Sequence, residues 1–266
     1  MAMICVKNGA LEYLTAENIS VPHGFTTRIG GVSQGVLAGL NLGMHRGDDP
    51  AAVEENYHIL CDALGCTANQ LVLTHQIHSD IVRKVSAADA AGLDHHNYPP
   101  CDALITNTPG VGLVVFTADC TPILLHDPVT GAVGAAHCGW RGTAASLAGK
   151  TAAAMVEAFG CDPENICAAI GPNIAQCCFQ TDGDVPQAMI ETFGDEVRAY
   201  IRPQGNKYYV NLKAINALSL RRVGVRNLCL SDECTACRPD RFWSHRVTGG
   251  NRGAQGAIIL CKEVGT

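Results

Sequence analysis

Four short apolar segments constrain the fold of this 266-residue chain more than any other feature. Each is rich in Val, Ile, Leu or Ala and is short enough to form a strand that is buried on both faces. These segments are residues 111–116, 132–136, 166–170 and 257–261. Further short strands are predicted at residues 21–27, 71–73 and 81–85.

Four other segments predict helices, because they are alanine-rich or repeat apolar residues at helical spacing. The first begins with Asp49 as N-cap and Pro50 in its first turn, and it ends at Gly65. The others are expected near residues 143–159, 184–194 and 211–223. Helices and strands are mixed without regular alternation, which favours an α+β fold with mixed sheets. Because no linker or repeat marks a boundary, a single domain over residues 1–266 is expected.

Composition excludes several classes of protein. The net charge of -6 and the absence of a basic run argue against a nucleic-acid partner. No apolar run approaches the roughly 20 residues that span a bilayer, so no membrane association is expected. The chain has 14 cysteines, and its first twenty residues do not resemble a signal peptide. Reduced thiols and a cytoplasmic location are therefore expected.

Two histidines and one cysteine lie in motifs that packing alone does not explain. They are His78 in Gln-Ile-His, Cys120 in Thr-Ala-Asp-Cys, and His137 in His-Cys-Gly-Trp-Arg-Gly. Taken singly, each is more often a satisfied polar residue or a core thiol. Together, two imidazoles and a thiolate form a transition-metal site with one open position, as in catalytic sites. We expect segments 112–116 and 132–136 to pair as a hairpin that brings Cys120 and His137 to the same end.

Charged neighbours extend this site. Asp119 precedes Cys120, and Arg141 follows His137 closely, so both are predicted to take part in catalysis. Residues 141–143 open an alanine-rich helix, where the free amides of Gly142 and Thr143 and the guanidinium would bind an anion. A plain helix cap at Thr143 is an equally good interpretation.

A glycine-rich stretch at residues 30–50 predicts a long functional loop. It carries Asn41, His45 and Asp48 as candidate substrate-binding residues, and its glycines allow a ligand to approach the backbone. The alternative is a surface loop. Arg246 belongs to a cationic group near the last strand and is a further candidate for substrate binding, although a surface position is as plausible.

Four cysteines outside these motifs carry weaker signals. Cys234 and Cys237 form a single Cys-x-x-Cys, whereas a structural zinc site needs a second pair, and none is obvious in the sequence. Cys177 and Cys178 are adjacent and are predicted to be two reduced thiols.

Along nearly its whole length the chain resembles the laccase-domain family. This family is also described as multicopper polyphenol oxidases and as purine nucleoside phosphorylases, and its bacterial branch is labelled a peptidoglycan-editing factor. The motifs that carry the resemblance lie at residues 23–33, 40–50, 76–78, 117–120, 137–142, 171–174, 178–179, 234–235 and 243–246. The chain departs from the family pattern at Ser79, where glycine is usual, at Cys138, where alanine is usual, and at Gln180, where glutamate is common.

The resemblance implies a four-layer α/β/β/α sandwich with His78, Cys120 and His137 as zinc ligands. It also implies phosphorolysis of adenosine, inosine and methylthioadenosine, together with adenosine deaminase activity. The partners would then be a small-molecule nucleoside and phosphate, and the protein would be a monomer or homodimer. Asp119 or His45 would carry a proton.

Phosphorolysis also needs a site for phosphate. In this interpretation the Arg141 guanidinium, the amides at residues 142–143 and the Arg246 guanidinium would bind it.

Three other functions fit the same residues. A copper polyphenol oxidase could use the two histidines, the cysteine and an axial Met44, Met155 or Met189. The 10 histidines contain no His-x-His pair, however, which disfavours a multicopper centre. A cysteine amidase acting on cell-wall precursors would use Cys120 as nucleophile and His137 as base. A non-enzymatic metal-binding or scaffold protein is the least economical alternative.

Overall fold

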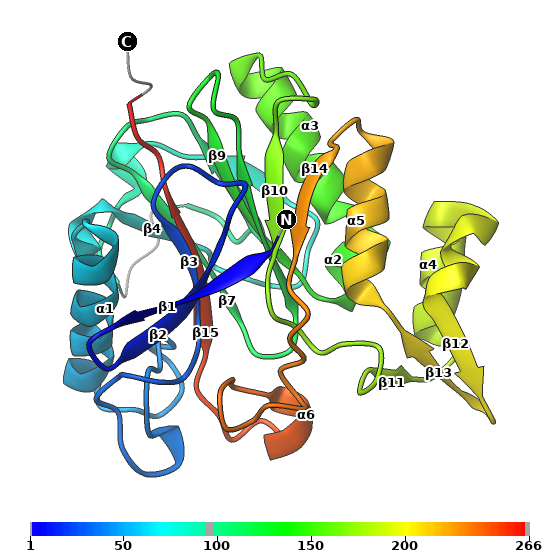
Figure 1. Ribbon diagram of the computed structural model, residues 1–266, viewed down its shortest axis with the longest axis horizontal. Coiled ribbons are helices and arrows are strands. Elements are labelled where there is room, and N and C mark those ends of the chain that lie inside the picture. Colours follow the sequence, from blue (N-terminus) through cyan, green and yellow to red (C-terminus); the bar gives the residue numbers. More distant parts are fainter. Residues whose placement is uncertain (1, 94–97, 264–266) are drawn as a thin grey trace.

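The computed structural model describes residues 2–93 and 98–263, and its strands form two large sheets and a small one (Figure 1). The first sheet has the order β1 (Met3–Asn8), β2 (Leu11–Ala16), β3 (His23–Thr26), β15 (Gln255–Leu260), β7 (Gly112–Thr117), β4 (Leu71–Leu73). The second has the order β14 (Asn227–Leu230), β10 (Cys167–Ile170), β8 (Thr121–His126), β9 (Val133–Cys138), β6 (Ala103–Thr106), β5 (Val82–Lys84). The small sheet contains β11 (Gln180–Thr181), β13 (Lys207–Val210) and β12 (Ile201–Gln204). Both large sheets mix parallel and antiparallel pairs, as predicted.

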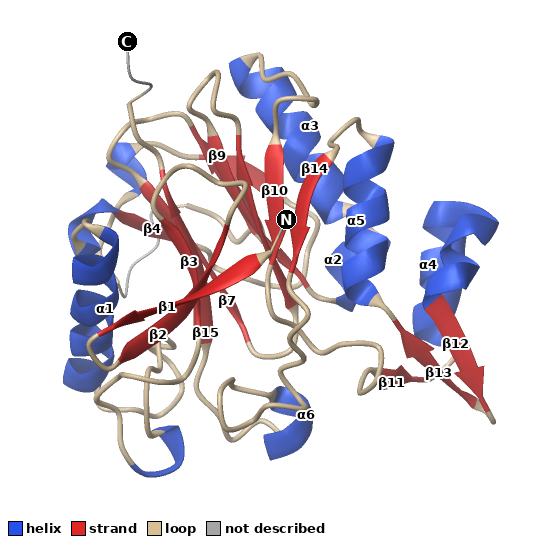
Figure 2. Ribbon diagram, viewed as in Figure 1, coloured by secondary structure: helices blue, strands red, loops and turns tan. Residues whose placement is uncertain are grey.

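Some helices cover the outer faces of the two large sheets, whereas others lie beside the small sheet or within loops (Figure 2). The α-helices of the described residues are α1 (Pro50–Leu64), α2 (Trp140–Ala144), α3 (Leu147–Phe159), α4 (Asp184–Phe193), α5 (Leu212–Arg222) and α6 (His245–Thr248). Short 3-10 helices are η1 (Gly35–Leu37), η2 (Ala68–Gln70), η3 (Ala87–Asp89) and η4 (Gly194–Tyr200). Helix α1 lies on the first sheet, and α3 and α5 lie on the second, so the expected α/β/β/α sandwich is confirmed. No helix in the described ranges is both long enough and apolar enough to cross a bilayer.

The alternation of side chains along the strands builds the layers. In β7, Leu113 and Val115 face the central layer between the sheets, whereas Val114 faces α1. In β9, Val133 and Ala135 face the same central layer. Strands whose two faces are both buried need apolar residues at every position, which is why they read as continuous apolar runs.

The ends of α1 follow the sequence signals. The Asp49 side chain accepts a hydrogen bond from the Ala51 amide at 3.0 Å, and Pro50 occupies the first position of the helix. Gly65 ends the helix with φ 69°, a left-handed conformation that glycine adopts without strain. The predicted start and end of this helix are confirmed.

The predicted pairing of segments 112–116 and 132–136 is wrong. These segments become β7 and β9, which lie in different sheets. The strands that pair with β9 are β8 and β6, and the sequence analysis predicted neither of them. The turn at Asp127 and Gly131 therefore joins β8 to β9, and the chain crosses between the sheets at residues 118–120. Pro122 and the nearby polar residues make the sequence of β8 unlike that of a typical buried strand, so β8 was not predicted.

The helix predicted at residues 143–159 is two helices. Its start lies earlier, at Trp140, and a break at Ser146 separates α2 from α3. Ser146 has φ 59°, and its hydroxyl lies 2.7 Å from the Ser219 hydroxyl of α5. This tertiary contact favours the break.

Replacing Ile259 with Ala is expected to lower the free energy of unfolding by about 2–5 kcal/mol, because it leaves a cavity between the two large sheets. Denaturant unfolding measures the change. Val129→Ala is the control, since that side chain is 63% exposed and its truncation should change stability by less than about 0.5 kcal/mol. Equal losses of stability in the two variants would contradict the burial of Ile259 between the two large sheets.

Candidate metal centre

His78, Cys120 and His137 converge, as the sequence predicts. Their ligand atoms all lie within 4.8 Å of one another, and the Cys120 Sγ is 4.0 Å from the His78 Nε2. The two imidazole rings meet edge to face, with centroids 4.9 Å apart and planes at 86°. The three donors therefore surround one point from different directions.

Cys120 and His137 lie at the ends of strands, and His78 lies in a loop between two strands. Cys120 is the last residue of the crossover between β7 and β8, at the rim of both sheets. His137 lies in β9 at the alternation of Val133 and Ala135, so its ring faces the space between the sheets. His78 lies in the loop that follows β4.

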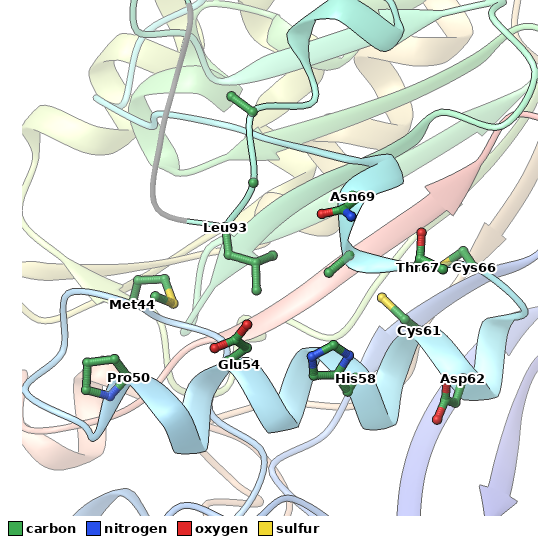
Figure 3. Close-up of a pocket in the computed structure, with 13 residues that line it drawn as sticks. Met44, Pro50, Glu54, His58, Cys61, Asp62, Cys66, Thr67, Asn69 and Leu93 are labelled. Atoms are coloured by element: carbon green, nitrogen blue, oxygen red, sulfur yellow. The ribbon is translucent and has the colours of Figure 1, made fainter.

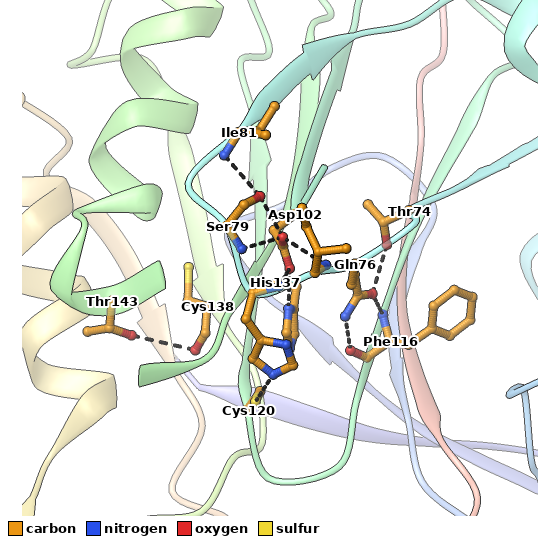
Figure 4. Close-up of polar contacts among 12 residues, drawn as sticks. Thr74, Gln76, Ser79, Ile81, Asp102, Phe116, Cys120, His137, Cys138 and Thr143 are labelled. Carbon is orange, nitrogen blue, oxygen red and sulfur yellow. Dashed lines mark hydrogen bonds and ion pairs between the residues drawn. The ribbon is translucent and has the colours of Figure 1, made fainter. Parts of the chain in front are cut away.

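Asp102 organises the site, and the sequence analysis missed it. This fully buried carboxylate lies just before β6. It accepts hydrogen bonds from the amides of Ile77, His78 and Ser79 at 3.2, 3.1 and 2.6 Å, and from the Ser79 hydroxyl at 2.7 Å (Figure 4). The His137 Nδ1 lies 2.8 Å from its Oδ1. Asp102 therefore leaves the His137 Nε2 free to bind a metal, and a carboxylate in this position is the usual partner of a metal-bound histidine.

Gln76 attaches the His78 loop to the first sheet. Its side-chain amide donates to the Phe116 carbonyl at 2.8 Å and accepts from the Phe116 amide at 2.7 Å, with a third bond from the Thr74 hydroxyl at 2.8 Å. The side chain thus continues the β4–β7 ladder beyond the end of β4. This explains why glutamine precedes the histidine motif.

Backbone strain is concentrated at one ligand, His78, and at Asp119, the residue before Cys120. Only three non-glycine residues within residues 2–93 and 98–263 have positive φ, and two of them are His78 at 61° and Asp119 at 89°. Such conformations persist where the surrounding structure imposes them, and they cluster at functional sites. Gly139 contributes in another way, because a Cβ there would lie 3.0 Å from the His78 ring and 3.2 Å from the Cys120 Sγ.

The departures from the family pattern beside the ligands have separate roles. Ser79 supplies two of the hydrogen bonds to Asp102. Cys138 is buried against α3, and its sulfur points away from Cys120 (Figure 4). Burial raises the pKa of the Cys138 thiol far above its ordinary value. Cys138 is therefore a core residue and does not join the three donors.

The charges of the site stabilise one another. Burial raises the pKa of Cys120, but the charge of His137 and hydrogen bonds from both histidines outweigh it and lower that pKa to about 6. Burial lowers the pKa of His137, but the Cys120 thiolate and Asp102 raise it to about 9. Burial acts against ionisation of Asp102 too, yet hydrogen bonds from His137 and Ser79 bring its pKa to about 2. Without metal, the site therefore holds a thiolate–imidazolium pair, and metal binding must release the His137 proton.

The donor set fits a divalent transition metal. Bonds of about 2.0–2.3 Å to nitrogen and sulfur allow one ion to reach two donors that lie 4.0 Å apart. Two imidazoles and one thiolate leave a coordination position open, and that position faces a cavity of about 120 Å³. The three donors could therefore bind one metal ion whose open position is accessible from the cavity.

Asp119 does not face this cavity. One oxygen of its carboxylate accepts from the Thr235 hydroxyl at 2.6 Å, and the other accepts from the Arg246 amide at 2.6 Å. The Asp119 carbonyl accepts from the Ile174 amide at 2.9 Å. These contacts make Asp119 a residue that positions Cys120, and they leave no support for its predicted role in proton transfer.

The candidates in the glycine-rich loop separate into two groups. Asn41 is fully buried and donates to Asp48 at 2.7 Å, while its oxygen accepts from the amides of Gly43 and Ala254. Asn41 and Asp48 therefore shape the loop. His45 is exposed and lines a neighbouring cavity of about 340 Å³.

The predicted anion site at residues 141–143 is not formed as expected. Thr143 is fully buried, its amide donates to the Gly139 carbonyl, and its hydroxyl accepts from Asn216 at 2.9 Å. Gly142 is buried as well, and neither residue lines the cavity. Because α2 starts three residues earlier than expected, the Thr143 amide is already bonded within the helix, and the Gly142 amide lies in a buried first turn away from the cavity.

The two predicted arginines also lie away from the cavity lining. The Arg141 guanidinium is exposed and stacks 4.3 Å from the Trp140 ring centroid. Arg246 donates to the carbonyls of Cys178 and Gln180 at 2.8 and 3.1 Å, which fixes it to the small sheet.

Two other arginines line the cavity. Arg46 and Arg252 lie in its wall with the three donors, Gln76 and Phe116. The Arg252 Nε is buried and has no hydrogen-bond partner among the described residues. Burial and the neighbouring Arg46 charge lower the pKa of Arg252 to about 10, although the charges of Cys120 and Asp119 act in the opposite direction. The sequence offered only a weak signal for these residues, because each is one of several cations in a glycine-containing segment.

The cavity at the three donors adjoins a second cavity, which in turn adjoins a third. It shares Arg46 and Phe116 with the cavity of about 340 Å³ that His45 lines. That second cavity shares Met44 and Leu93 with a third one of about 520 Å³, whose wall is α1 (Figure 3). The third cavity is the largest of the three but contains none of the metal donors, so the chemistry lies at the other end of the series.

The family model described as multi-copper polyphenol oxidoreductase laccase matches residues 22–262. The chain belongs to this laccase-domain family. This laccase-domain chain is 39% identical over 249 residues to a purine nucleoside phosphorylase of Deinococcus radiodurans, which covers 94% of this chain and 92% of the relative. It is 36% identical over 221 residues to the purine nucleoside phosphorylase YfiH of Escherichia coli, covering 83% and 86%. The crystal structure of YlmD from Geobacillus stearothermophilus matches with a TM-score of 0.87 at 32% identity, covering 98% and 100%.

Asp102→Asn is expected to weaken metal binding to this laccase-domain protein about 10–100-fold, because the amide cannot accept all five hydrogen bonds that orient His137 and the His78 loop. Competition with a chromophoric chelator measures the affinity. Asp127→Asn is the matched control, since Asp127 is fully buried in the β8–β9 turn and accepts from the Val129 amide. Equal losses in the two variants would show that Asp102 has no specific role.

The metal-free protein is expected to be alkylated at Cys120 with a rate that rises through pH about 6 and levels off above it, because the lowered pKa makes the thiolate dominant there. The alkylation rate of an ordinary cysteine, by contrast, keeps rising with pH until about 8.5, where its thiol ionises. Peptide mapping after short iodoacetamide treatment measures the rate at this one residue. A rate that keeps rising through pH 8 would contradict the thiolate–imidazolium pair, and loading with metal should protect Cys120.

Proposed function

We propose that this protein is a zinc-dependent purine nucleoside phosphorylase that also deaminates adenosine. The observation that carries the proposal is the pair of arginines, Arg46 and Arg252, in the same small cavity as His78, Cys120 and His137. Phosphorolysis needs an anion site beside a site for the nucleoside, and relatives that cover most of this chain are named purine nucleoside phosphorylases.

Phosphate fits between the two arginines. The unpartnered Arg252 Nε offers a buried donor, and the repulsion between Arg252 and Arg46 would be relieved by an anion between them. This assignment replaces the phosphate site expected at Arg141, residues 142–143 and Arg246.

The nucleoside base fits the adjoining cavity of about 340 Å³. Leu73, Phe116 and Met44 give this cavity apolar walls, and His45 and Arg46 give it polar groups. Flat aromatic ligands bind in such mostly apolar cavities with a few fixed polar contacts. Adenosine, inosine and methylthioadenosine share the purine and ribose that this arrangement would hold.

In phosphorolysis, a phosphate oxygen bonds to C1′ of the ribose while the bond from C1′ to the purine nitrogen breaks. The products are ribose 1-phosphate and the purine base, which takes up a proton. Arg46 and Arg252 would orient the phosphate, and His45 is placed to deliver the proton. In deamination, water replaces the 6-amino group of adenosine and ammonia leaves.

His78, Cys120 and His137 would hold zinc, with Asp102 fixing the tautomer of His137. Zinc bound there supplies a Lewis acid with an open coordination position. Copper is less well supported, because Met155 and Met189 are buried in other layers and Met44 lines the neighbouring cavity. None of these three methionines lines the cavity at the donors, so the structure offers no methionine as the axial ligand of a blue-copper site.

A second candidate is a cysteine hydrolase such as an amidase. One specific observation favours it: Cys120, His137 and Asp102 form a nucleophile–base–carboxylate series. His78 distinguishes the two functions, because a nucleophilic cysteine needs no second imidazole, whereas a metal site does.

Arg252→Gln is expected to raise the KM for phosphate about tenfold or more and to change the KM for inosine little, because it removes a charged donor to the anion. Chromatographic measurement of hypoxanthine from inosine and phosphate gives both constants. Arg141→Gln is the control, since Arg141 stacks on Trp140 outside the cavity, and it should leave the KM for phosphate unchanged.

Cys120→Ala should abolish both phosphorolysis and deamination in zinc-loaded protein. Full phosphorolysis by this variant would overturn the proposal. Amide hydrolysis by metal-free wild-type protein, lost on alkylation of Cys120, would favour the hydrolase instead.

A further inference from the structure

Four cysteines meet at a second place in the fold, although the sequence analysis found no second pair for Cys234 and Cys237. The adjacent Cys177 and Cys178 supply that pair, and all four sulfurs lie within 4.8 Å of one another. The Cys237 Sγ is 3.6 Å from the Cys177 Sγ and 3.4 Å from the Cys178 Sγ, and the last two are 3.7 Å apart. The sequence could not reveal the pairing because more than fifty residues separate the two motifs.

These distances suit one tetrahedral ion. Zinc–sulfur bonds of about 2.3 Å place neighbouring thiolates about 3.8 Å apart. A disulfide needs sulfurs about 2.05 Å apart, and the observed separations are far longer. Four thiolates around one point are the donor set of a closed structural zinc site.

The backbone around these cysteines is arranged as in a metal site. Residues 173 and 234 form a parallel bridge that holds the two cysteine turns together, and the Thr235 amide donates to the Asn173 carbonyl at 3.0 Å. The Ala175 amide donates to the Cys234 Sγ at 3.3 Å. Amide bonds to sulfur stabilise a thiolate, which is the form that binds metal.

A buried cation lies beside this cluster. The Lys213 ammonium of α5 donates to the carbonyls of Ser231 and Glu233, immediately before Cys234. Zinc with four thiolates carries a net charge of about −2. A neighbouring ammonium therefore reduces the cost of holding that charge.

We propose that Cys177, Cys178, Cys234 and Cys237 form a structural zinc site, separate from the His78–Cys120–His137 centre. On binding, the four thiols lose their protons and no electrons are transferred. Asp119 connects the two sites, because it accepts from Thr235, which lies between two of the cysteines in sequence. The second ion thereby braces the crossover that carries Cys120.

The test uses Cys120→Ala protein, in which the first centre has lost its thiolate. Purified under reducing conditions, incubated with zinc and desalted against a mild chelator, this variant should retain one equivalent of zinc per chain by elemental analysis. Cobalt in place of zinc should give the intense near-ultraviolet thiolate charge-transfer bands of a four-sulfur site. This arm leaves all four cysteines intact, so misfolding of a cluster variant cannot obscure it.

Adding Cys237→Ser to this variant should remove the retained zinc, whereas adding Cys5→Ser, an exposed cysteine outside the cluster, should not. Absence of zinc and of the cobalt bands in Cys120→Ala protein would overturn the proposal. So would zinc that persists in the Cys237→Ser variant, or a disulfide between Cys237 and Cys177 or Cys178 in protein kept reduced. None of these results depends on phosphorolysis, so the proposed function stands or fails independently.

Discussion

The buried carboxylate of Asp102 is the interaction on which the metal centre depends. It joins the His78 loop to the His137 strand through five hydrogen bonds, three of them from consecutive backbone amides. An unpaired carboxylate in this position would be strongly destabilising, so the loop amides and the imidazole must be present together. The same bonds hold His78 in its left-handed conformation and fix the tautomer of His137. One side chain thus sets the orientation of two of the three donors.

The crossover between the sheets supplies the third donor. The chain leaves β7, turns through Asp119 at φ 89° and enters β8 directly after Cys120. Contacts from Thr235 and from the Arg246 amide hold this strained turn from the far side. The centre therefore draws on both sheets and on the carboxy-terminal segments, which explains why motifs spread over nearly the whole chain belong to one site.

Features that depend on neighbouring residues were predicted from the sequence, whereas features that depend on contacts between distant segments were not. The ends of α1 follow from Asp49 and Gly65, because capping depends on neighbouring residues. The hairpin prediction failed because strand pairing is decided by partners far along the chain, and Pro122 made β8 look unlike a strand. The phosphate-site prediction failed for a related reason: where α2 begins depends on the turn at Gly139 rather than on the helix composition.

The sequence by itself determined the mixed fold, the three metal donors and the glycine-rich loop, since residue type and spacing carry that information. Only the tertiary structure decided that Asp102 orients the donors, that Arg252 rather than Arg141 faces the cavity, and that two distant cysteine pairs meet. These depend on which side of a strand or helix a residue faces and on what packs against it. Such facts arise from contacts between segments far apart in sequence, which no local pattern encodes.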